Sequence, residues 1–228
     1  MDARLHKTML AKVLLALYKN TYLSQVLGFK GWTCAMFFYD LPRLSVDLDF
    51  DILRPYDDVL EEGIIGELEP ILREFWEITD FAVKKNTILY EIRYQNYERR
   101  LKLEISTRGA SGGFEKHNFL WENISVMRES DLFSNKLVAL LGRKWITNRD
   151  IFDIWFFLAK WTEIQEWIIR EYTQKDLTNY LDAVRNFIKH YDFKKILYWL
   201  WELLDEKQKH FAKTKMQDEI LWYLSFYS

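Results

Sequence analysis

The chain has little cysteine, proline or glycine, and each scarcity limits the kind of protein it can be. Among its 228 residues there is one cysteine, Cys34, which excludes an intramolecular disulfide and indicates a reducing compartment. Only 3 prolines and 8 glycines are present, and this composition favours long, regular elements over a fold rich in loops. The hydrophobic fraction of 49% is ordinary for a globular protein whose length allows a substantial core.

Long apolar runs and an excess of positive charge are also missing. The N-terminal stretch MDARLHKTMLAKVLLALYKN is interrupted by Lys7, Lys12 and Lys19, so it predicts neither a signal peptide nor a membrane-spanning helix. The formal net charge is -2, so no overall basic field indicates a nucleic-acid partner, and any such contact has to be local. We therefore expect a cytoplasmic protein with no membrane association.

The pattern of apolar residues changes near residue 129. We expect an α/β core over residues 1–128, with a helix at 6–19, an acidic strand in SVDLDFDIL and a three-stranded meander in WEITDFAVKK, TILYEIRYQ and RLKLEIST. Residues 129–228 show helical periodicity, with helices expected at about 130–143, 149–161, 175–189, 193–204 and 206–225. The predicted fold is a mixed β-sheet with flanking helices, followed by a C-terminal helical bundle.

Three aspartates occupy every second position of the run RLSVDLDFDI, although aspartate is usually depleted in strands. In a strand, Asp47, Asp49 and Asp51 share one face, opposite the apolar Leu48 and Phe50. An exposed strand face would explain a bare Asp-x-Asp pair. Alternatively, Asp47 and Asp49, roughly 6.5–7 Å apart along the strand, suit a two-metal site. Because Mg²⁺ prefers a few carboxylates plus substrate phosphates, such a pair fits a nucleoside triphosphate.

Two neighbouring features add to the carboxylate pair. Glu104 is a lone acid on the apolar strand RLKLEIS, and it becomes a third carboxylate if that strand lies beside the acidic one. Otherwise it is a surface residue paired with Lys102 or Arg93. Upstream, FKGWT reads as a strand, a glycine turn and a helix start, a geometry that directs backbone N–H groups at an anion.

In combination, KGWTCAMFFYDLPRLSVDLDFDI is similar to the first motif of the AbiEii/AbiGii-type nucleotidyltransferase toxins, which have the DNA polymerase β-like fold. That motif reads Gly-Gly-Thr-Ala-Leu, a short helix, then Arg-x-Ser-x-Asp-(Leu/Ile)-Asp-Phe. The residues that match it are Gly31, Thr33, Arg43, Ser45, Asp47, Asp49 and Phe50. The later stretch SNKLVALLGRKWITNRDIFDIW resembles the family's helical Lys and its Arg-Asp-x-x-Asp motif, and this likeness carries over Lys136, Arg149, Asp150 and Asp153. The chain departs from the family at Trp32, where a second glycine is expected, and at Glu104, where the acid is commonly Asp.

The resemblance implies an enzyme that transfers a nucleoside monophosphate from an NTP to an acceptor and releases pyrophosphate. Asp47, Asp49 and Glu104 would hold Mg²⁺ or Mn²⁺, and Glu104 would also help to deprotonate the acceptor. Asp150 would orient Lys136 or Arg43, or act as an additional base; Asp51 is expected to be peripheral. The residues implied for nucleotide binding are Gly31, Thr33, Arg43, Ser45, Lys136, Arg149 and Asp153.

The family also implies a role and partners. It points to the toxin of a toxin–antitoxin or abortive-infection system used in phage defence, with the 3′ end of tRNA as one acceptor class and an antitoxin that carries a DNA-binding domain. The basic segments RYQNYERRLK and EKQKHFAKTK would supply phosphate contacts or form solvated faces. Two alternatives stay open: the acceptor is a protein or a small molecule, or Trp32 leaves an inactive scaffold that only binds nucleotide. Lys136 could also be a solvated lysine, and Asp153 a partner of Arg149.

Overall fold

A computed structural model describes residues 3–75, 77–93, 100–143 and 148–227 of the chain. The chain divides into two compact units, of which the first comprises Met1–Asp40 and Leu44–Arg128. The second comprises Leu41–Arg43 and Glu129–Ser228. None of the helices in the described ranges combines the length and the apolar character that a membrane span requires.

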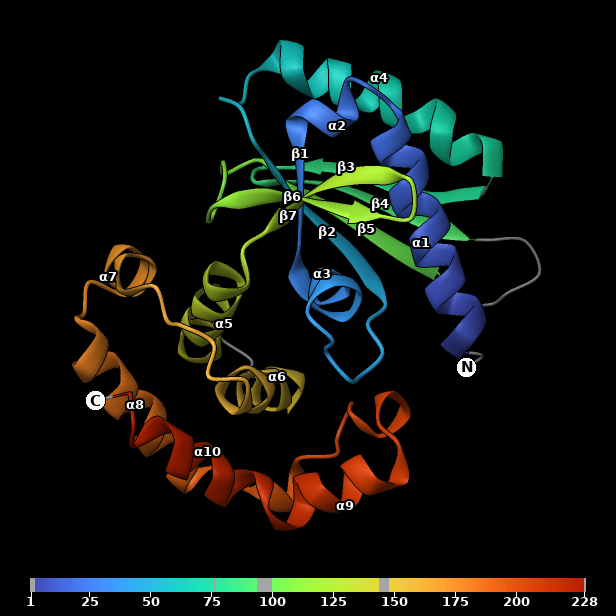
Figure 1. Cartoon of the computed structure of the whole chain (residues 1–228). Coiled ribbons are helices and arrows are strands. Elements are labelled where there is room, and N and C mark those ends of the chain that lie inside the picture. The colour runs from blue at the N-terminus through green and yellow to red at the C-terminus, as the bar shows by residue number, and fades with distance from the viewer. Residues whose placement is uncertain (1–2, 76, 94–99, 144–147, 228) are drawn as a thin grey trace. The chain divides into compact units, whose positions relative to one another are not determined.

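The first unit is built on a seven-stranded mixed sheet (Figure 1). Its strands are β1 (Leu27–Lys30), β2 (Asp47–Ile52), β3 (Glu77–Lys84), β4 (Thr87–Arg93), β5 (Arg100–Ser106), β6 (Phe114–Phe119) and β7 (Glu122–Met127). They lie in the order β3-β4-β5-β2-β1-β7-β6. The central pair β1–β2 is antiparallel, while β2 pairs with β5, and β1 with β7, in parallel. The acidic strand β2 is therefore flanked by β1 and β5.

Within the described residues, this unit also contains the helices α1 (Ala3–Lys19), α2 (Leu23–Val26), α3 (Gly31–Phe38) and α4 (Asp58–Phe75). Helices α1 and α4 contact one another, and α1 also contacts β2 and β7 (Figure 1). The apolar side chains of β2, Leu48, Phe50 and Ile52, are fully buried. The Tyr18 hydroxyl of α1 lies within hydrogen-bond distance of the main-chain oxygens of Leu27 (2.9 Å) and Ser125 (3.1 Å), and its one proton bonds the helix to the sheet.

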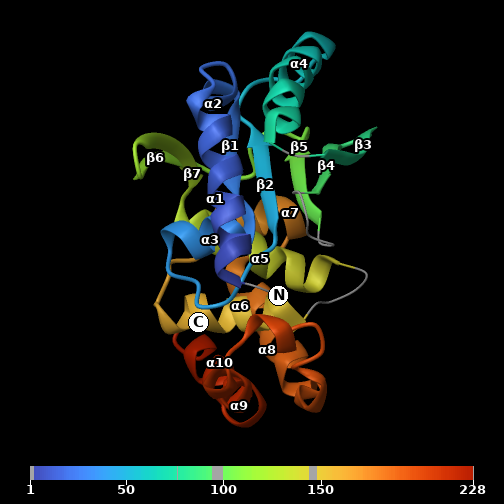
Figure 2. The same cartoon turned by 90° about the vertical axis from the view of Figure 1, so that its right-hand side faces the viewer.

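The second unit is helical (Figure 2). Its helices are α5 (Glu129–Gly142), α6 (Asn148–Ala159), α7 (Glu166–Thr173), α8 (Leu177–His190), α9 (Glu206–Thr214) and α10 (Met216–Leu224), with 3₁₀ turns at Phe193–Lys195 and Trp201–Leu203. Helix α5 contacts α6 and α7, while α10 contacts α6 and α8. The short segment Leu41–Arg43 also belongs to this unit. The main-chain oxygen of Pro42 accepts a hydrogen bond from Gln208 Nε2 (2.6 Å).

The predicted mixed α/β fold and the β3-β4-β5 meander are confirmed, whereas two predicted helices are wrong and two elements were not predicted. The hairpin β6–β7 and the helix α7 were not expected. Residues 193–204 form turns instead of a helix, with Tyr198 and Trp199 70% and 78% exposed while Leu200 is buried. The expected helix 206–225 is two helices that meet at Lys215, whose backbone is not helical (φ -131°).

Candidate active site

The acidic face of β2 lies between two strands that each contribute a charged residue to it. In the sheet register, Asp49 is paired with Glu104 of β5 on one side and with Lys30 of β1 on the other. Residues paired in this way place their side chains on the same face of the sheet. Asp47 precedes Asp49 by two residues on that face and is partly buried, like Asp49. The strand of Glu104 thus lies beside the acidic strand, which is the condition under which Glu104 becomes a third carboxylate.

The Asp49 carboxyl group is crowded by negative charge. Burial, followed by the charges of Asp47 and Glu104, raises the pKa of Asp49 to about 7, whereas Lys30 and Lys102 act to lower it. Neither carboxylate oxygen accepts a hydrogen bond from any residue in the described ranges. A carboxyl group with a raised pKa and vacant acceptor positions is typical of a functional site rather than of a structural ion pair.

The glycine turn lies directly against this carboxyl group. Gly31 has a φ of +73°, and a Cβ atom at this position would overlap the Asp49 side chain. Gly31 begins α3, so the N-terminal backbone N–H groups of that helix are close to Asp49. Trp32 is the second residue of α3, and the left-handed φ of this turn belongs to Gly31 alone. The backbone torsion angles therefore do not explain why a glycine would be needed at position 32.

Two hydroxyl groups fasten α3 to the segment that leads into β2. The Thr33 hydroxyl is 2.9 Å from the Ser45 hydroxyl and also donates to the main-chain oxygen of Asp47. Both side chains are buried. In this arrangement Thr33 and Ser45 hold the glycine turn against the acidic strand, and their hydroxyl groups face one another.

The carboxylates of the first unit fit a divalent metal ion by their chemistry. Asp47, Asp49 and Glu104 provide only oxygen donors, the kind that Mg²⁺ and Mn²⁺ prefer, and a bound cation would relieve the repulsion at Asp49. The three carboxylates do not point at one common position, since Glu104 forms an ion pair with Lys102 (2.5 Å). Within the described ranges, no three His, Cys, Asp or Glu side chains are grouped closely enough to hold an ion.

In the second unit, the matched motifs form a buried group of charges. Arg43 binds Asp153 of α6 through two bonds, Nε to Oδ1 at 2.6 Å and Nη2 to Oδ2 at 2.7 Å. Their side chains are only 1% and 0% exposed. The alternative in which Asp153 pairs with Arg149 is therefore wrong. Arg149 is partly exposed and forms no ion pair or side-chain hydrogen bond with the described part of the chain.

Lys136 of α5 belongs to the same buried group and is not a solvated lysine. Its ammonium group binds Asp150 and lies 3.5 Å from Asp153 Oδ2. Arg143 approaches Asp150 from the other side, at 3.5 Å. Burial lowers the pKa of Lys136 to about 8, although Asp153 and Asp150 act to raise it. Asp150 was expected to orient Lys136 or Arg43, or to act as a base. The structure shows its contact with Lys136, whereas Arg43 is bound by Asp153.

Three residues that the motifs did not predict belong to the acidic face: Asp51, Lys30 and Ser111. Asp51, expected to be peripheral, is fully buried and forms an ion pair with Lys30. It also accepts hydrogen bonds from the backbone N–H (2.9 Å) and hydroxyl (2.6 Å) of Ser111. The third aspartate of DLDFDI was a signal for this contact, since a buried strand position needs a partner for a charge.

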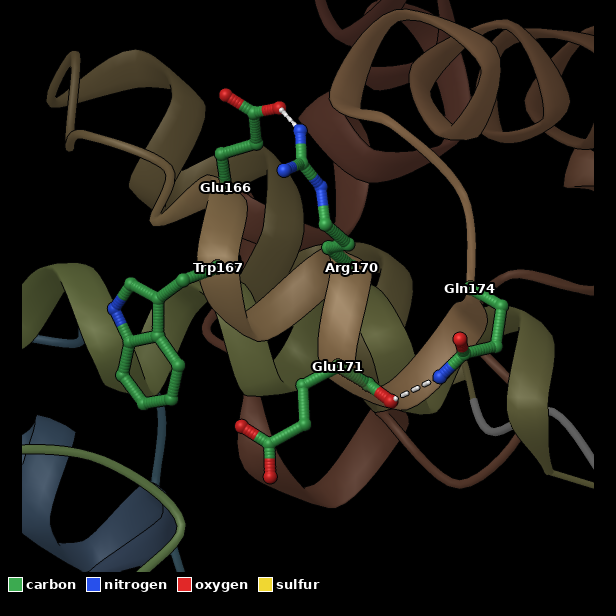
Figure 3. Close-up of a pocket in the computed structure, with 5 residues that line it drawn as sticks. All are labelled: Glu166, Trp167, Arg170, Glu171 and Gln174. Atoms are coloured by element: carbon green, nitrogen blue, oxygen red, sulfur yellow. Dashed lines mark hydrogen bonds and ion pairs between the residues drawn. The ribbon is translucent and has the colours of Figure 1, made fainter.

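Outside these groups, α7 has a surface hollow of about 490 Å³ (Figure 3). It is lined by Glu166, Trp167, Arg170, Glu171 and Gln174. Arg170, the cation of this hollow, is already paired with Glu166 at 2.6 Å, and Gln174 donates to the main-chain oxygen of Glu171. None of the residues predicted from the motifs lines the hollow, so it carries no part of the candidate site.

The two basic segments differ in what the structure says of them. The segment RYQNYERRLK falls mostly on residues 94–99, which lie outside the described ranges. The segment EKQKHFAKTK forms α9, where Lys209 pairs with Glu206 (2.7 Å) and lies 4.0 Å from the ring centre of Trp201. At least one lysine of α9 is therefore engaged within the unit.

Comparisons with known proteins give one family and several structural relatives. The family model described as "Nucleotidyl transferase AbiEii toxin, Type IV TA system" matches residues 13–222, most of the chain. No curated protein matches the chain.

Several solved structures share the fold. A candidate nucleotidyltransferase from H. pylori is 21% identical, with a TM-score of 0.62 over 100% of this chain and 98% of that one. JHP933 from Helicobacter pylori is 19% identical, with a TM-score of 0.60 over 99% and 94% of the two chains. An antigenic nucleotidyltransferase-like protein from Paracoccidioides brasiliensis is 14% identical, with a TM-score of 0.56 over 82% and 91%.

Proposed function

The chain belongs to the AbiEii nucleotidyl transferase toxin family of type IV toxin–antitoxin systems. From this premise we propose that it transfers a nucleoside monophosphate from an NTP to RNA. The proposed acceptor is the 3′ end of tRNA. The observation that supports this chemistry best is the environment of Asp49. Its carboxyl group is crowded by Asp47 and Glu104 and lies against the Gly31 turn at the start of α3. Acidic ligands beside a helix N-terminus suit a metal-bound triphosphate.

Asp47, Asp49 and Glu104 are the residues that would hold Mg²⁺ or Mn²⁺, which supplies positive charge against the triphosphate when bound. Gly31, with no side chain, leaves room for Asp49 beside the turn, and the backbone N–H groups of α3 offer donors to phosphate oxygens. Thr33 and Ser45 keep this turn in place against β2. The first unit would in this way position the triphosphate by backbone and carboxylate groups together.

In the reaction, the acceptor hydroxyl oxygen bonds to the α-phosphorus, and the bond between that phosphorus and the pyrophosphate oxygen breaks. The hydroxyl proton needs a base, and we assign this role to Glu104, whose side chain is 37% exposed. Asp150 suits the role less, because it is buried and holds Lys136. The family resemblance assigns the ammonium group of Lys136 to the triphosphate charge, and Lys136→Met tests that assignment.

The family implies a cognate antitoxin, and we propose a regulator with a DNA-binding domain for that role, in a system that limits growth during phage infection. We place the activity in the cytoplasm, where NTPs and tRNA occur. Expression of the chain without its antitoxin is expected to stop growth, and Asp49→Asn is expected to restore it.

The transfer reaction is tested with each NTP, labelled with ³²P at the α- or the γ-position, in the presence of Mg²⁺ and total tRNA. We expect the α-label on RNA and the γ-label in pyrophosphate, because the bond between the α- and β-phosphates is the one that breaks. Asp49→Asn is expected to lower the transfer by roughly a hundredfold or more. Asp80→Asn is the matched control, since Asp80 is an exposed acid of β3, and it is expected to leave the transfer unchanged.

The alternatives give different outcomes in the same assay. An α-label on protein or on a small molecule would replace RNA as the acceptor. Absence of label from all four NTPs, with a folded protein, would favour a scaffold that binds nucleotide without transferring it.

A further inference from the structure

Asp51 is the acid of β2 whose partners are complete. Its side chain is 0% exposed. Oδ2 accepts two hydrogen bonds from Ser111, and the only described partner of Oδ1 is the ammonium group of Lys30. A buried carboxylate without its cation would be costly, so the position of Lys30 and the charge of Asp51 depend on one another.

Lys30 reaches Asp51 along the same face of the sheet that carries Asp49. It is the residue directly before Gly31, and in the β1–β2 register it is paired with Asp49, while Gly28 is paired with Asp51. The ammonium group therefore extends from beside Asp49 toward Asp51. It is held at its end by the carboxylate and by Ser111 Oγ, at 3.5 Å.

The glycine-rich loop after β5 is part of this arrangement. Ser111 lies in the middle of the segment GASGG (109–113), and it binds Asp51 through both its backbone and its side chain. Gly109 has a φ of +88°, and the oxygen of Gly113 accepts a hydrogen bond from the backbone N–H of Arg128 (2.9 Å). The loop is thus fastened to the sheet at Asp51 and at its end.

Lys30 retains the capacity to bind a ligand. An ammonium group has three N–H donors, and Asp51 and Ser111 occupy two of them. The third has no protein partner in the described ranges, and 23% of the side chain is exposed. A purely structural ion pair would gain nothing from this exposure, whereas a cation that binds an anion needs it.

The local charge also calls for such a cation. Around the acidic face, the four carboxylates of Asp47, Asp49, Asp51 and Glu104 stand against the two ammonium groups of Lys30 and Lys102, which leaves a net charge of -2. One bound divalent ion would only cancel this charge, so a triphosphate that enters this surface still needs a cation that contacts it directly. Lys102 is already paired with Glu104.

We propose that Lys30 is a phosphate-binding residue of the nucleotide site and that Asp51, together with Ser111, is the positioning residue that holds its ammonium group there. The inference rests on the proposed function, because it takes the triphosphate of an NTP as the ligand. It adds to that function a cation from β1 and a role for the glycine-rich loop.

The test measures binding of inorganic triphosphate, with MgCl₂, by isothermal titration calorimetry. Lys30→Met is expected to weaken binding by about tenfold to a hundredfold, the range for one charge-assisted hydrogen bond. Lys84→Met is the matched control, because Lys84 is an exposed lysine of β3, and it is expected to bind like the wild type. Lys30→Arg, which keeps the charge, is expected to restore most of the affinity.

A second variant guards against loss of folding. In Lys30→Met combined with Asp51→Asn no charge is left buried, and the Asn oxygen can still accept from Ser111. This double variant is expected to fold and to bind triphosphate as weakly as Lys30→Met. Asp51→Asn alone is expected to raise the KM for NTP several-fold with a smaller change in kcat, whereas a merely structural role would lower stability and leave KM unchanged.

Wild-type affinity for triphosphate in the folded double variant would overturn the inference, as would a wild-type protein that binds no triphosphate. A wild-type protein that binds triphosphate through Lys30 but transfers no nucleotide would refute the proposed function and support the inference. The two failures are therefore distinguishable.

Discussion

Replacing Asp49 with asparagine is expected to stabilise the metal-free protein at pH 8. The pKa of Asp49 is raised from 3.8 to about 7, mainly by burial and by the charges of Asp47 and Glu104. For an acid, a raised pKa in the folded state means that folding favours the neutral form. The cost of ionisation is therefore absent below pH 3.8, grows between pH 3.8 and about 7, and is complete above that range. Asparagine removes the charge and keeps the shape.

The size of the gain follows from the pKa shift. At about 1.4 kcal/mol for each pKa unit, the full shift corresponds to about 4 kcal/mol as an upper limit. Asp49 is partly exposed, so solvent screening reduces this value, and we expect a gain near 2 kcal/mol. For a chain of this length, that gain corresponds to a rise in Tm of roughly 4–8 °C.

The assay is thermal unfolding of the wild type and Asp49→Asn between pH 4 and pH 8, in buffer with EDTA, with Asp80→Asn as the exposed-acid control. The Tm difference is expected to be small at pH 4 and to grow up to about pH 7. Adding Mg²⁺ at pH 8 is expected to stabilise the wild type and not the variant. A Tm difference that does not change with pH, or a less stable variant at pH 8, would refute the argument that Asp49 is held in a repulsive environment.

Two further predictions concern residues that the structure places in close contact. Arg43→Met and Asp153→Leu are each expected to lower the free energy of unfolding by about 3–5 kcal/mol, and the double variant is expected to recover most of the loss, because no charge is then left buried alone. Additive losses in urea denaturation of the four proteins would contradict this pairing. Gly31→Ala is expected to lower that free energy by about 1–3 kcal/mol and to impair transfer, because its φ is +73° and a Cβ would displace Asp49. The control Gly66→Ala, on α4 where a Cβ meets open space, is expected to raise it by about 0.5–1 kcal/mol, so equal effects of the two changes would argue against the special geometry of Gly31.

Alternation along one strand was enough to predict which side chains of β2 carry charge and which enter the core. Leu48 and Phe50 are buried, while Asp47 and Asp49 share the other face, because the side-chain period of a strand is two. The meander of β3, β4 and β5 was also predictable from three consecutive β-rich runs. The pairing of Asp49 with Glu104 is a relation between strands far apart in sequence, so its register came only from the structure.

Burial of charged residues could not be predicted, because the partners that permit it are distant in sequence. Arg43 and Asp153 are 110 positions apart, and each alone reads as a surface residue. The aromatic segment near Trp199 was expected to lie in a helix over residues 193–204, because its residues show helical periodicity, but it forms turns. Trp199 is 78% exposed and has a φ of 65°, a backbone conformation that interrupts a helix.

The aspartates of the candidate site differ in whether a cation of the protein neutralises their charge. Asp51 and Asp153 are fully buried, yet each has a cation within ion-pair distance, and this pairing offsets the cost of burying their charges. Asp49, only two residues from Asp51, accepts no hydrogen bond from the described part of the chain and is repelled by other carboxylates. The fold pairs Lys30 with Asp51 and leaves Asp49 without an ion pair in the described residues, so Asp49 lowers the stability of the protein. That cost is understandable if a ligand, rather than the protein, is to complete the coordination of Asp49.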